Sequence, residues 1–539
     1  MPNPVLQREL IAHLRAPRAF VLQGVYLLAL GAIVAAAWPA DRKLDLTNPG
    51  AARPLVELFF AGQFLFTALV TPAFAAGAIT GEKERKSYEM LLASALRPAA
   101  IVRGKWAAAA VPALLFNLSS IPIVVLCLPL GGVSIYEVAA AYGLLTAAIV
   151  CFSLVSLTCS GFFARTTSAL VTSYVVVLPA AAAMIGGWAW LGRGDVRTRL
   201  AVCGAVVPPA VVATIAVLFP LLRRRLWYPP DVGSEGKEVV DEAHDLRAAV
   251  GLVLRRHEFP DRLFAPAKRN DLLPDAVNPV LDKELRSELF SQGTLMLRLV
   301  LQISLLMSLP LMGACLYFNP GWAPWYVCYV LLFNLLAGPA FSAGSVSGER
   351  ERRTLDLLLV TTLAPSTILR GKLLSGWRVS GILTSLLAWP LALAFVLVPE
   401  YYPAWRSFLL YFALIGLTSL ATSTLSLFCS VTLKTSQAGL SAAYTASAVL
   451  FLAAPAADRF AQWFFPATTA ARLVHAATAT SPFAAAFALP LDAAVPEEAA
   501  RAADWPVVLG HGLFQLALIG LLLGPMRRMF RNRYDAAGE

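Results

Sequence analysis

The sequence predicts an all-α polytopic membrane protein with about twelve transmembrane helices, arranged as two parallel repeats of six spans each. Three observations support this fold class. Of the 539 residues, 58% are hydrophobic and only 14% are charged, and the mean hydropathy is +0.66. Soluble domains carry roughly 45–50% apolar and about 25% charged residues. The apolar residues gather in runs of ~20, the length that crosses a bilayer as a helix. Finally, a charged segment between two such runs occurs twice.

The expected spans divide the chain into two halves joined by a linker. The first half, residues 1–225, has apolar runs at 19–38, 57–78, 106–129, 135–163, 168–190 and 200–222. The second half, residues 278–539, has apolar runs at 295–317, 323–345, 373–398, 406–432, 437–456 and 505–526. Residues 226–277 are rich in proline and charge and predict a cytosolic linker. Residues 458–505 form an enlarged segment before the last span.

Two segments of the first half recur in the second half. The leading segment NPVLQREL at residues 3–10 returns as NPVLDKEL at residues 278–285. The segment TGEKERKSYEMLLASALRPAAIVRGK at 80–105, called the first insert, returns at 347–372 as SGERERRTLDLLLVTTLAPSTILRGK, called the second insert. Twelve of the 26 aligned insert positions are identical. Because six is an even number, each half begins and ends on one side, so the repeats are parallel rather than inverted.

The positions of Lys and Arg predict the orientation in the membrane, because cytosolic loops carry an excess of these residues. Both inserts and the ends of both halves are basic, whereas the loops near 130–135 and 318–322 hold neither residue type. We therefore expect both inserts, both termini and the linker to be cytosolic and residues 458–505 to face outward. The formal charge of +11 is explained by these topology signals, so no nucleic acid partner is expected.

Each insert is expected to form one short amphipathic helix on the cytosolic side, over 82–96 and 349–363. Thr80 and Ser347 can cap the helix N-termini with their hydroxyls. The acids that follow would then lie in the first turn, where the helix dipole favours negative charge. Pro98 or Pro365 ends the helix.

Two interpretations of these insert helices stay open. A helix that only lies on lipid needs basic charge and an apolar face, and has no need of acids at fixed places. The fixed order of acids and bases favours docking of a protein partner.

The leading segment also predicts a helix, which enters the first span of each half in the plane of the membrane. Asn3 and Asn278 can cap this helix, and Pro4 and Pro279 suit its first position. We expect its role to be structural.

The expected spans hold no Asp, Glu, Lys or Arg near their middle, where ion-coupled carriers usually need such groups. The polar residues near the middle are Gln63, Asn117, Gln302, Asn334 and Gln515. We expect them to hydrogen-bond neighbouring helices rather than bind a substrate. His511 lies in the last span, and we expect a packing role for it.

No motif of catalysis is present in the sequence. It has no GxxxxGK[ST] phosphate-binding loop and no metal-binding spacing of Cys and His. The seven cysteines lie in or beside apolar runs and are expected to be packing residues. We therefore predict that the chain is not an enzyme and that it has no visible energy source of its own.

At the inserts the chain resembles ABC transporter permeases of the type 2 exporter class, within the branch described as multi-copper-enzyme-maturation or gliding-motility permeases. The residues that carry the resemblance are Gly81-Glu82-Lys83-Glu84-Arg85 with Leu91-Leu92 and Gly104-Lys105, and Gly348-Glu349-Arg350-Glu351-Arg352 with Leu358-Leu359 and Gly371-Lys372. The leading NPVL…EL segments support it. The resemblance covers nearly the whole chain, with two permease halves fused in one chain.

The resemblance implies that the insert helices are coupling helices that dock on an ATPase. The docking residues would be Gly81, Glu82, Glu84, Arg85, Leu91, Leu92, Gly348, Glu349, Glu351, Arg352, Leu358 and Leu359. One chain would then bind two copies of an ABC ATP-binding subunit, with ATP and magnesium on that partner and no cofactor on the chain itself. The resemblance also implies export from the cytosol across a bacterial inner (plasma) membrane. Residues 458–505 would gate the exit or meet a periplasmic or other outer-face partner.

Two alternatives remain beside an ATP-driven permease. The chain could be a non-transporting ABC membrane module that relays ATP-driven motion to the other side, which the long segment 458–505 keeps open. It could also be an ion-coupled secondary carrier, against which the absence of mid-span charge counts.

Overall fold

The computed structural model describes most of the expected spans and both inserts. The described residues are 3–14, 17–37, 53–85, 87–94, 96–127, 134–163, 166–191, 196–227, 278–286, 304, 306–318, 320–351, 353–465, 468–489 and 504–538. Across these ranges the chain is helical and contains no strand. The predicted linker, residues 226–277, lies outside them from residue 228 onward.

The chain divides into two compact units, each described by itself below. The first unit comprises Met1–Pro229 with Ala456–Ala471, and the second comprises Pro230–Pro455 with Arg472–Glu539. The predicted boundaries of the two halves and the linker stay a prediction.

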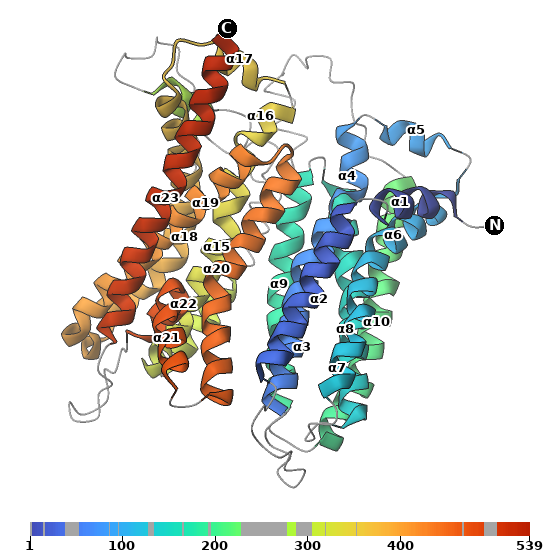
Figure 1. Cartoon of the computed structure of the whole chain (residues 1–539), viewed down its shortest axis with the longest axis horizontal. Coiled ribbons are helices and arrows are strands. Elements are labelled where there is room, and N and C mark those ends of the chain that lie inside the picture. The colour runs from blue at the N-terminus through green and yellow to red at the C-terminus, as the bar shows by residue number, and fades with distance from the viewer. Residues whose placement is uncertain are drawn as a thin grey trace. The chain divides into compact units, whose positions relative to one another are not determined.

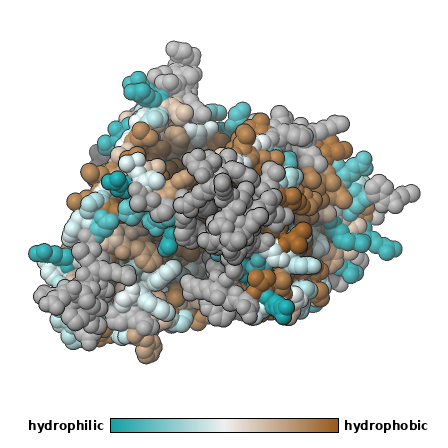
Figure 2. All heavy atoms as spheres, turned by 60° about the horizontal axis from the view of Figure 1, so that its bottom comes forward, coloured by the Kyte–Doolittle hydropathy of each residue, from teal (hydrophilic) through white to brown (hydrophobic). Residues whose placement is uncertain are grey.

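Ten helices of the described residues are long and apolar enough to cross a membrane. Two further apolar helices, Val21–Val34 and Leu306–Phe318, are shorter. They fall within the expected spans 19–38 and 295–317, parts of which lie outside the described residues. Large apolar side chains reach the surface over wide areas (Figure 2), as expected where helices face lipid rather than water. The predicted fold class, an all-α polytopic membrane protein, is confirmed.

The helices of the first unit pack around α8 (Figure 1). In chain order they are α1 Pro4–Leu14, α2 Pro17–Ala37, α3 Arg53–Ala75, α4 Gly77–Glu84, α5 Tyr88–Leu92, α6 Pro98–Ser119, α7 Ile121–Cys127, α8 Ile135–Phe162, α9 Thr166–Leu191 and α10 Val196–Trp227. Helix α8 contacts α3, α6, α9 and α10. An aromatic cluster fills the core, in which Tyr26 stacks on Phe66 at 4.4 Å and meets Phe116 edge-on at 5.6 Å.

The second unit packs around α19, which corresponds to α8 in the repeat. Its helices are α13 Pro279–Arg286, α15 Ala323–Ser342, α16 Ser347–Glu351, α17 Leu355–Leu359, α18 Pro365–Leu397, α19 Trp405–Thr432, α22 Pro482–Phe487 and α23 Trp505–Gly538. Short π- and 3₁₀-helices lie at Gly313–Phe318, Pro320–Trp322, Pro399–Ala404 and Thr478–Thr480. Helices α20 Ser436–Phe464 and α21 Thr469–Ala477 are divided between the two units.

One tyrosine bond shows that the repeat extends into the packing of the spans. In the first unit the Tyr174 hydroxyl donates to the carbonyl of Leu69 at 2.7 Å. In the second unit the Tyr444 hydroxyl donates to the carbonyl of Leu336, also at 2.7 Å. Each bond joins the helix before the insert to the fifth span of its half, so both halves use one tertiary contact at corresponding places.

Three of the polar mid-span residues bind neighbouring helices, as predicted, whereas Gln515 contacts His511 on its own helix. Gln63 donates to Ser120 (3.0 Å), Asn117 donates to Thr146 (3.3 Å), and Asn334 joins Thr384 and Thr422 (both 3.1 Å). Gln302 lies outside the described residues. His511 is buried and contacts the carbonyl of Ala479 at 2.9 Å and Gln515 at 3.2 Å, which confirms its packing role.

Candidate functional site

The first insert folds as two short helices, so the prediction of one helix over 82–96 is wrong. Helix α4 continues the preceding span and ends at Glu84, and α5 begins at Tyr88. Between them the amide of Ser87 donates to the carbonyl of Glu82 at 2.9 Å, five residues back. An α-helix steps back four residues, so this bond ends α4 and turns the chain.

The second insert repeats this break, so the predicted helix over 349–363 is also wrong. Helix α16 ends at Glu351 and α17 begins at Leu355. The amide of Thr354 donates to the carbonyl of Glu349 at 2.9 Å, as at the corresponding place in the first insert. Arg353 lies in the left-handed region with a φ of 57°, which costs free energy for a residue with a side chain.

The predicted hydroxyl caps of the inserts are absent. Thr80 lies inside α4, and its hydroxyl donates to the carbonyl of Ala76 at 2.8 Å. The Ser347 hydroxyl likewise donates to the carbonyl of Ala343 at 3.0 Å. The helix continues through these residues because the preceding span runs on without a break, so no free N-terminus needs a cap.

The acids of the first insert lie in the last turn of α4 rather than the first, which corrects the predicted dipole argument. A carboxylate is disfavoured by the dipole at a helix C-terminus, so Glu82 and Glu84 need other partners there. Glu349 lies in the first turn of α16, but α16 continues the preceding span, so no free helix N-terminus lies beside this acid.

The second acid of each insert caps the helix that follows the central span. The Glu84 carboxylate accepts from both the amide and the hydroxyl of Thr166, at 2.7 Å each. The Glu351 carboxylate accepts from the amide of Ser436 at 3.1 Å and from its hydroxyl at 2.6 Å. Thr166 and Ser436 begin α9 and α20, where orphan amides and the helix dipole favour a negative charge.

The base between the two acids binds the C-terminus of the central span. Lys83 donates to the carbonyls of Gly161 at 2.8 Å and Phe163 at 2.9 Å, at the end of α8. Arg350 donates to the carbonyl of Val431 at 2.9 Å, at the end of α19. Positive charge at a helix C-terminus satisfies the last carbonyls and complements the dipole.

The first acid of the first insert belongs to a group of four charges around a buried lysine, called the first charge cluster. The Lys105 ammonium, 2% exposed, lies 3.1 Å from Glu9 and 3.5 Å from Glu82, and donates to the carbonyl of Ala78 at 2.6 Å. Arg8 adds an outer contact with Glu82 at 3.9 Å. The cluster joins α1, α4 and α6.

The second charge cluster likewise has two acids and two bases. The Lys372 ammonium is fully buried and lies 2.8 Å from Glu284 and 3.1 Å from Glu349, and it donates to the carbonyl of Ser345 at 2.8 Å. Lys283 adds an outer contact with Glu349 at 3.2 Å. This cluster joins α13, α16 and α18.

These contacts change the interpretation of the inserts' acidic residues. Glu82, Glu84, Glu349 and Glu351 bind within their own unit, so the fixed order of acids and bases has an internal explanation. Of the remaining candidates, Arg85 is exposed, Gly81 has open space beside it, and Gly348 lies beside Ser436. Arg352 lies outside the described residues.

The predicted docking leucines point largely inward. Leu359 is buried with Val280, Ile368 and Leu427, and Leu92 packs against the cluster that contains Tyr88. Leu91 and Leu358 are partly buried. Burial also raises the pKa of the Tyr88 hydroxyl, an effect that the positive charge of Arg225 opposes.

The apolar side chains that the inserts do expose are Met90, which is 77% exposed, and Leu357, which is 72% exposed. They occupy corresponding positions of the repeat on α5 and α17. Val360, one turn after Leu357, is also exposed. Both residues follow the break that ends α4 and α16, which the sequence pattern did not reveal.

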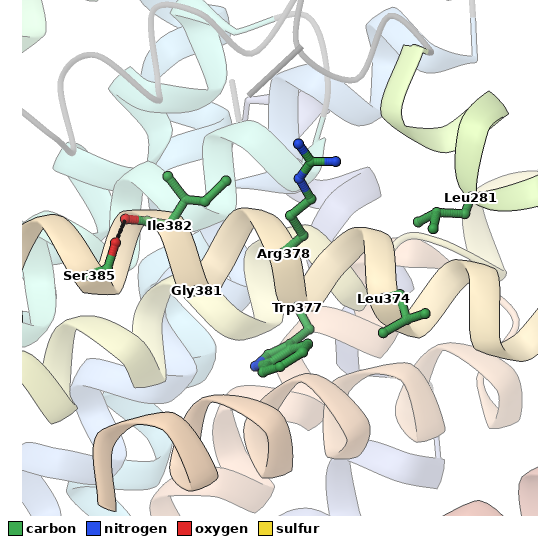
Figure 3. Close-up of a pocket in the computed structure, with 7 residues that line it drawn as sticks. All are labelled: Leu281, Leu374, Trp377, Arg378, Gly381, Ile382 and Ser385. Atoms are coloured by element: carbon green, nitrogen blue, oxygen red, sulfur yellow. Dashed lines mark hydrogen bonds between the residues drawn. The ribbon is translucent and has the colours of Figure 1, made fainter. Parts of the chain in front are cut away.

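A separate pocket lies beside α13 and α18. It has a volume of about 480 Å³ and is lined by Leu281, Leu374, Trp377, Arg378, Gly381, Ile382 and Ser385. In Figure 3 the Arg378 side chain points away from the Trp377 ring, and the Ser385 hydroxyl donates to the carbonyl of Ile382. Among the described residues no group of His, Cys, Asp or Glu could hold a metal ion.

Residues 234–495 match the family described as ABC-2 family transporter protein. The match includes the second charge cluster and the second insert, and together with the apolar helices it supports an ABC-2 type permease, a membrane component of an ABC transporter. Members of this family are generally non-catalytic and normally pair with an ATP-binding subunit. No curated protein and no solved structure matches the chain.

Proposed function

We propose that the chain is the permease of an ATP-driven exporter, with two fused halves whose α5 and α17 act as coupling helices. The observation that carries the proposal is the exposure of Met90 and Leu357 at corresponding positions of the repeat. Both lie on short helices that follow a network of ion pairs and caps, so an apolar contact is presented from a fixed base. Large exposed apolar side chains outside a lipid-facing span favour a protein interface.

The charges beside these helices indicate the partner's chemistry. Arg85 and Arg97 beside α5 and Arg353 beside α17 are exposed, and so are the acids Glu89 on α5 and Asp356 on α17. Exposed acids do not suit a helix that only lies on lipid, whereas a partner cleft with an apolar floor and a rim of both charges would complement both helices. Two such helices on one chain fit two copies of an ATP-binding subunit, which would carry the ATP and magnesium.

The location and direction belong to the same proposal. The basic residues of the inserts favour the cytosolic side of a bacterial inner membrane, with both termini also cytosolic. Export follows from the resemblance to type 2 exporters. Helix α22 and the preceding 3₁₀-helix Thr478–Thr480 pack on α23 within the second unit, at a place suited to an exit gate or to a periplasmic partner.

The test uses the full chain in membranes with an ATP-binding subunit encoded next to it. We expect Met90→Asp with Leu357→Asp to weaken binding of that subunit by at least about tenfold, since a charge replaces a central apolar contact on each side. The matched control, Met90→Leu with Leu357→Met, keeps the apolar volume and should bind normally. Unchanged affinity of the aspartate pair, measured by titration, would contradict docking at α5 and α17.

A further inference from the structure

The repeated charge clusters join the leading helix of each unit to its insert. In each unit one buried lysine is bound by a glutamate of the leading helix and by a glutamate of the insert. The lysine itself is the last residue of the insert and lies on the long helix α6 or α18. The leading helix is far from both in the sequence, and the lysine is the group that contacts it and the insert glutamate together.

Each lysine has three oxygen atoms around its ammonium. An ammonium has three N–H donors, and Lys105 and Lys372 each have three oxygen partners, namely one carbonyl and two carboxylates. The lysine and the outer base, Arg8 or Lys283, balance the two acids, so each cluster is neutral as a whole. A neutral cluster around a buried charge favours one arrangement of the elements that supply it.

The leading helix is also held by close packing. A Cβ on Gly104 would lie 2.9 Å from Asn3 Nδ2 and 3.0 Å from Val5 Cβ. Asn3 caps its helix by accepting from the amide of Val5 at 3.1 Å, as predicted, and donates to the carbonyl of Ala100 at 2.6 Å. The glycine directly before the lysine thus lets α1 lie against α6.

The second unit repeats this contact. A Cβ on Gly371 would lie 3.0 Å from the backbone nitrogen of Leu281 and from Val280 Cβ. Asn278 accepts from the amide of Val280 at 3.0 Å and donates to the carbonyl of Thr367 at 2.8 Å. The repeated sequence elements NPVL…EL, GE and RGK therefore contact one another in each half.

We propose that Lys105 and Lys372 are positioning residues that clamp each leading helix to the neighbouring insert, so that α1 moves with α5 and α13 moves with α17. This inference rests on the proposed function, because the movement of the insert helices is assigned to a partner docked at α5 and α17. The leading helix is then a moving part of the coupling machinery and not only an anchor. Charge is suited to this role, since it fixes a specific arrangement where apolar packing would allow sliding.

The clamp is tested first on the full chain alone, in nanodiscs, by hydrogen–deuterium exchange. Lys105→Met should speed exchange in residues 3–14 by about tenfold or more, because two acids lose their shared cation. Lys372→Met should do the same in residues 278–286. The matched controls are Arg103→Met and Arg370→Met, two residues earlier on the same helices, with exposed side chains. These controls should leave the exchange of the leading helices unchanged.

Milder variants keep the test informative if a methionine variant fails to fold. Glu9→Gln and Glu284→Gln leave the lysine in place and remove one ion pair, so exchange should rise in the same peptides by a smaller factor. Lys105→Arg and Lys372→Arg keep the charge and should restore much of the protection. A lysine that acted through its packing volume alone would not show this dependence on charge.

The second part of the experiment uses the complex of the chain with the ATP-binding subunit. In the wild type, binding of the ATP-binding subunit should slow exchange in the leading helices as well as in α5 and α17. In the lysine variants only the insert helices should respond, and ATP turnover per bound subunit should fall by about tenfold while affinity is kept. Equal exchange of the leading helices in lysine and control variants would overturn the clamp. If the subunit does not bind while the lysine variants still speed exchange, the proposed function fails and the clamp stands.

Discussion

At the insert end of the first unit, Glu84 caps α9, Lys83 binds the end of α8, and Lys105 holds two acids. The second unit repeats each of these contacts with corresponding residues. Within the described ranges, the ends of the spans away from the inserts share no such scheme. In the first unit, buried Arg199 binds Glu57 at 3.1 Å and Glu137 at 3.3 Å.

The second unit uses aromatic side chains and extra helices at that end instead. Tyr411 donates to the carbonyl of Leu489, and the rings of Trp325 and Phe487 meet edge-on at 5.0 Å. Helix α22 fills the space among α15, α19 and α23. The two units therefore hold their span ends together on that side with different contacts. At the insert end both units keep the same contacts, as expected if the function depends on the positions of these residues.

The largest effect should come from breaking the Arg199 ion cluster, which has no counterpart in the described part of the second unit. Arg199 is 3% exposed and Glu137 is 4% exposed, so Arg199→Met removes a cation from beside a buried carboxylate. We expect a loss of about 3–5 kcal/mol in unfolding free energy. Thermal unfolding in detergent measures it, with exposed Arg197→Met as the control. A shift no larger than the control's would mean that aromatic packing, as in the second unit, already suffices.

Gly104 and Gly371, which directly precede the two buried lysines, allow the insert ends of the two units to be compared by mutation. Gly371→Ala places a Cβ 3.0 Å from a backbone nitrogen, whereas Gly104→Ala first meets a side-chain amide that can move. We expect a loss of about 1–3 kcal/mol for Gly371→Ala and a smaller loss for Gly104→Ala. Gly81→Ala is the control, because nothing lies within 4 Å of its Cβ position and alanine favours a helix. The ranking fails if Gly81→Ala is the most damaging of the three.

The smallest effect should come from the capping acids. Glu84→Ala and Glu351→Ala each remove a cap from the following helix, for which we expect about 1 kcal/mol. Because both carboxylates make the same pair of bonds, the two losses should be similar. Hydrogen exchange of the first turns of α9 and α20 measures each locally. Exchange that rises in only one of the two helices would show that the repeat is not equivalent at this contact.

Much of the fold could be predicted from particular residues. The apolar runs predicted the spans, because only a helix satisfies its own backbone inside a bilayer. Asn3 and Asn278 predicted the starts of the leading helices, because an asparagine cap depends only on neighbouring backbone amides. Gln63, Asn117 and Asn334 were correctly expected to bind adjacent helices, because a lone amide in lipid needs a partner.

The site could be predicted only in part. The repeat identified the inserts, but the assignment of their acids to a partner overlooked internal ones: Thr166 lies 82 residues after Glu84, and Lys105 lies 96 residues after Glu9. No local pattern links residues so far apart. The same limit hid the exposure of Met90 and Leu357, which follows from where α4 and α16 end.

The sequence by itself determined that this chain is helical, crosses a membrane and carries one motif set twice, because these properties follow from hydropathy and from repeated local chemistry. Only the tertiary structure decided which charged side chains form ion pairs within each unit and which side chains stay exposed. Burial and ion pairing depend on distances between segments that the chain brings together only on folding. Each of the three repeated motifs could be recognised in the sequence. Their contact at a single lysine in each unit is a result of packing.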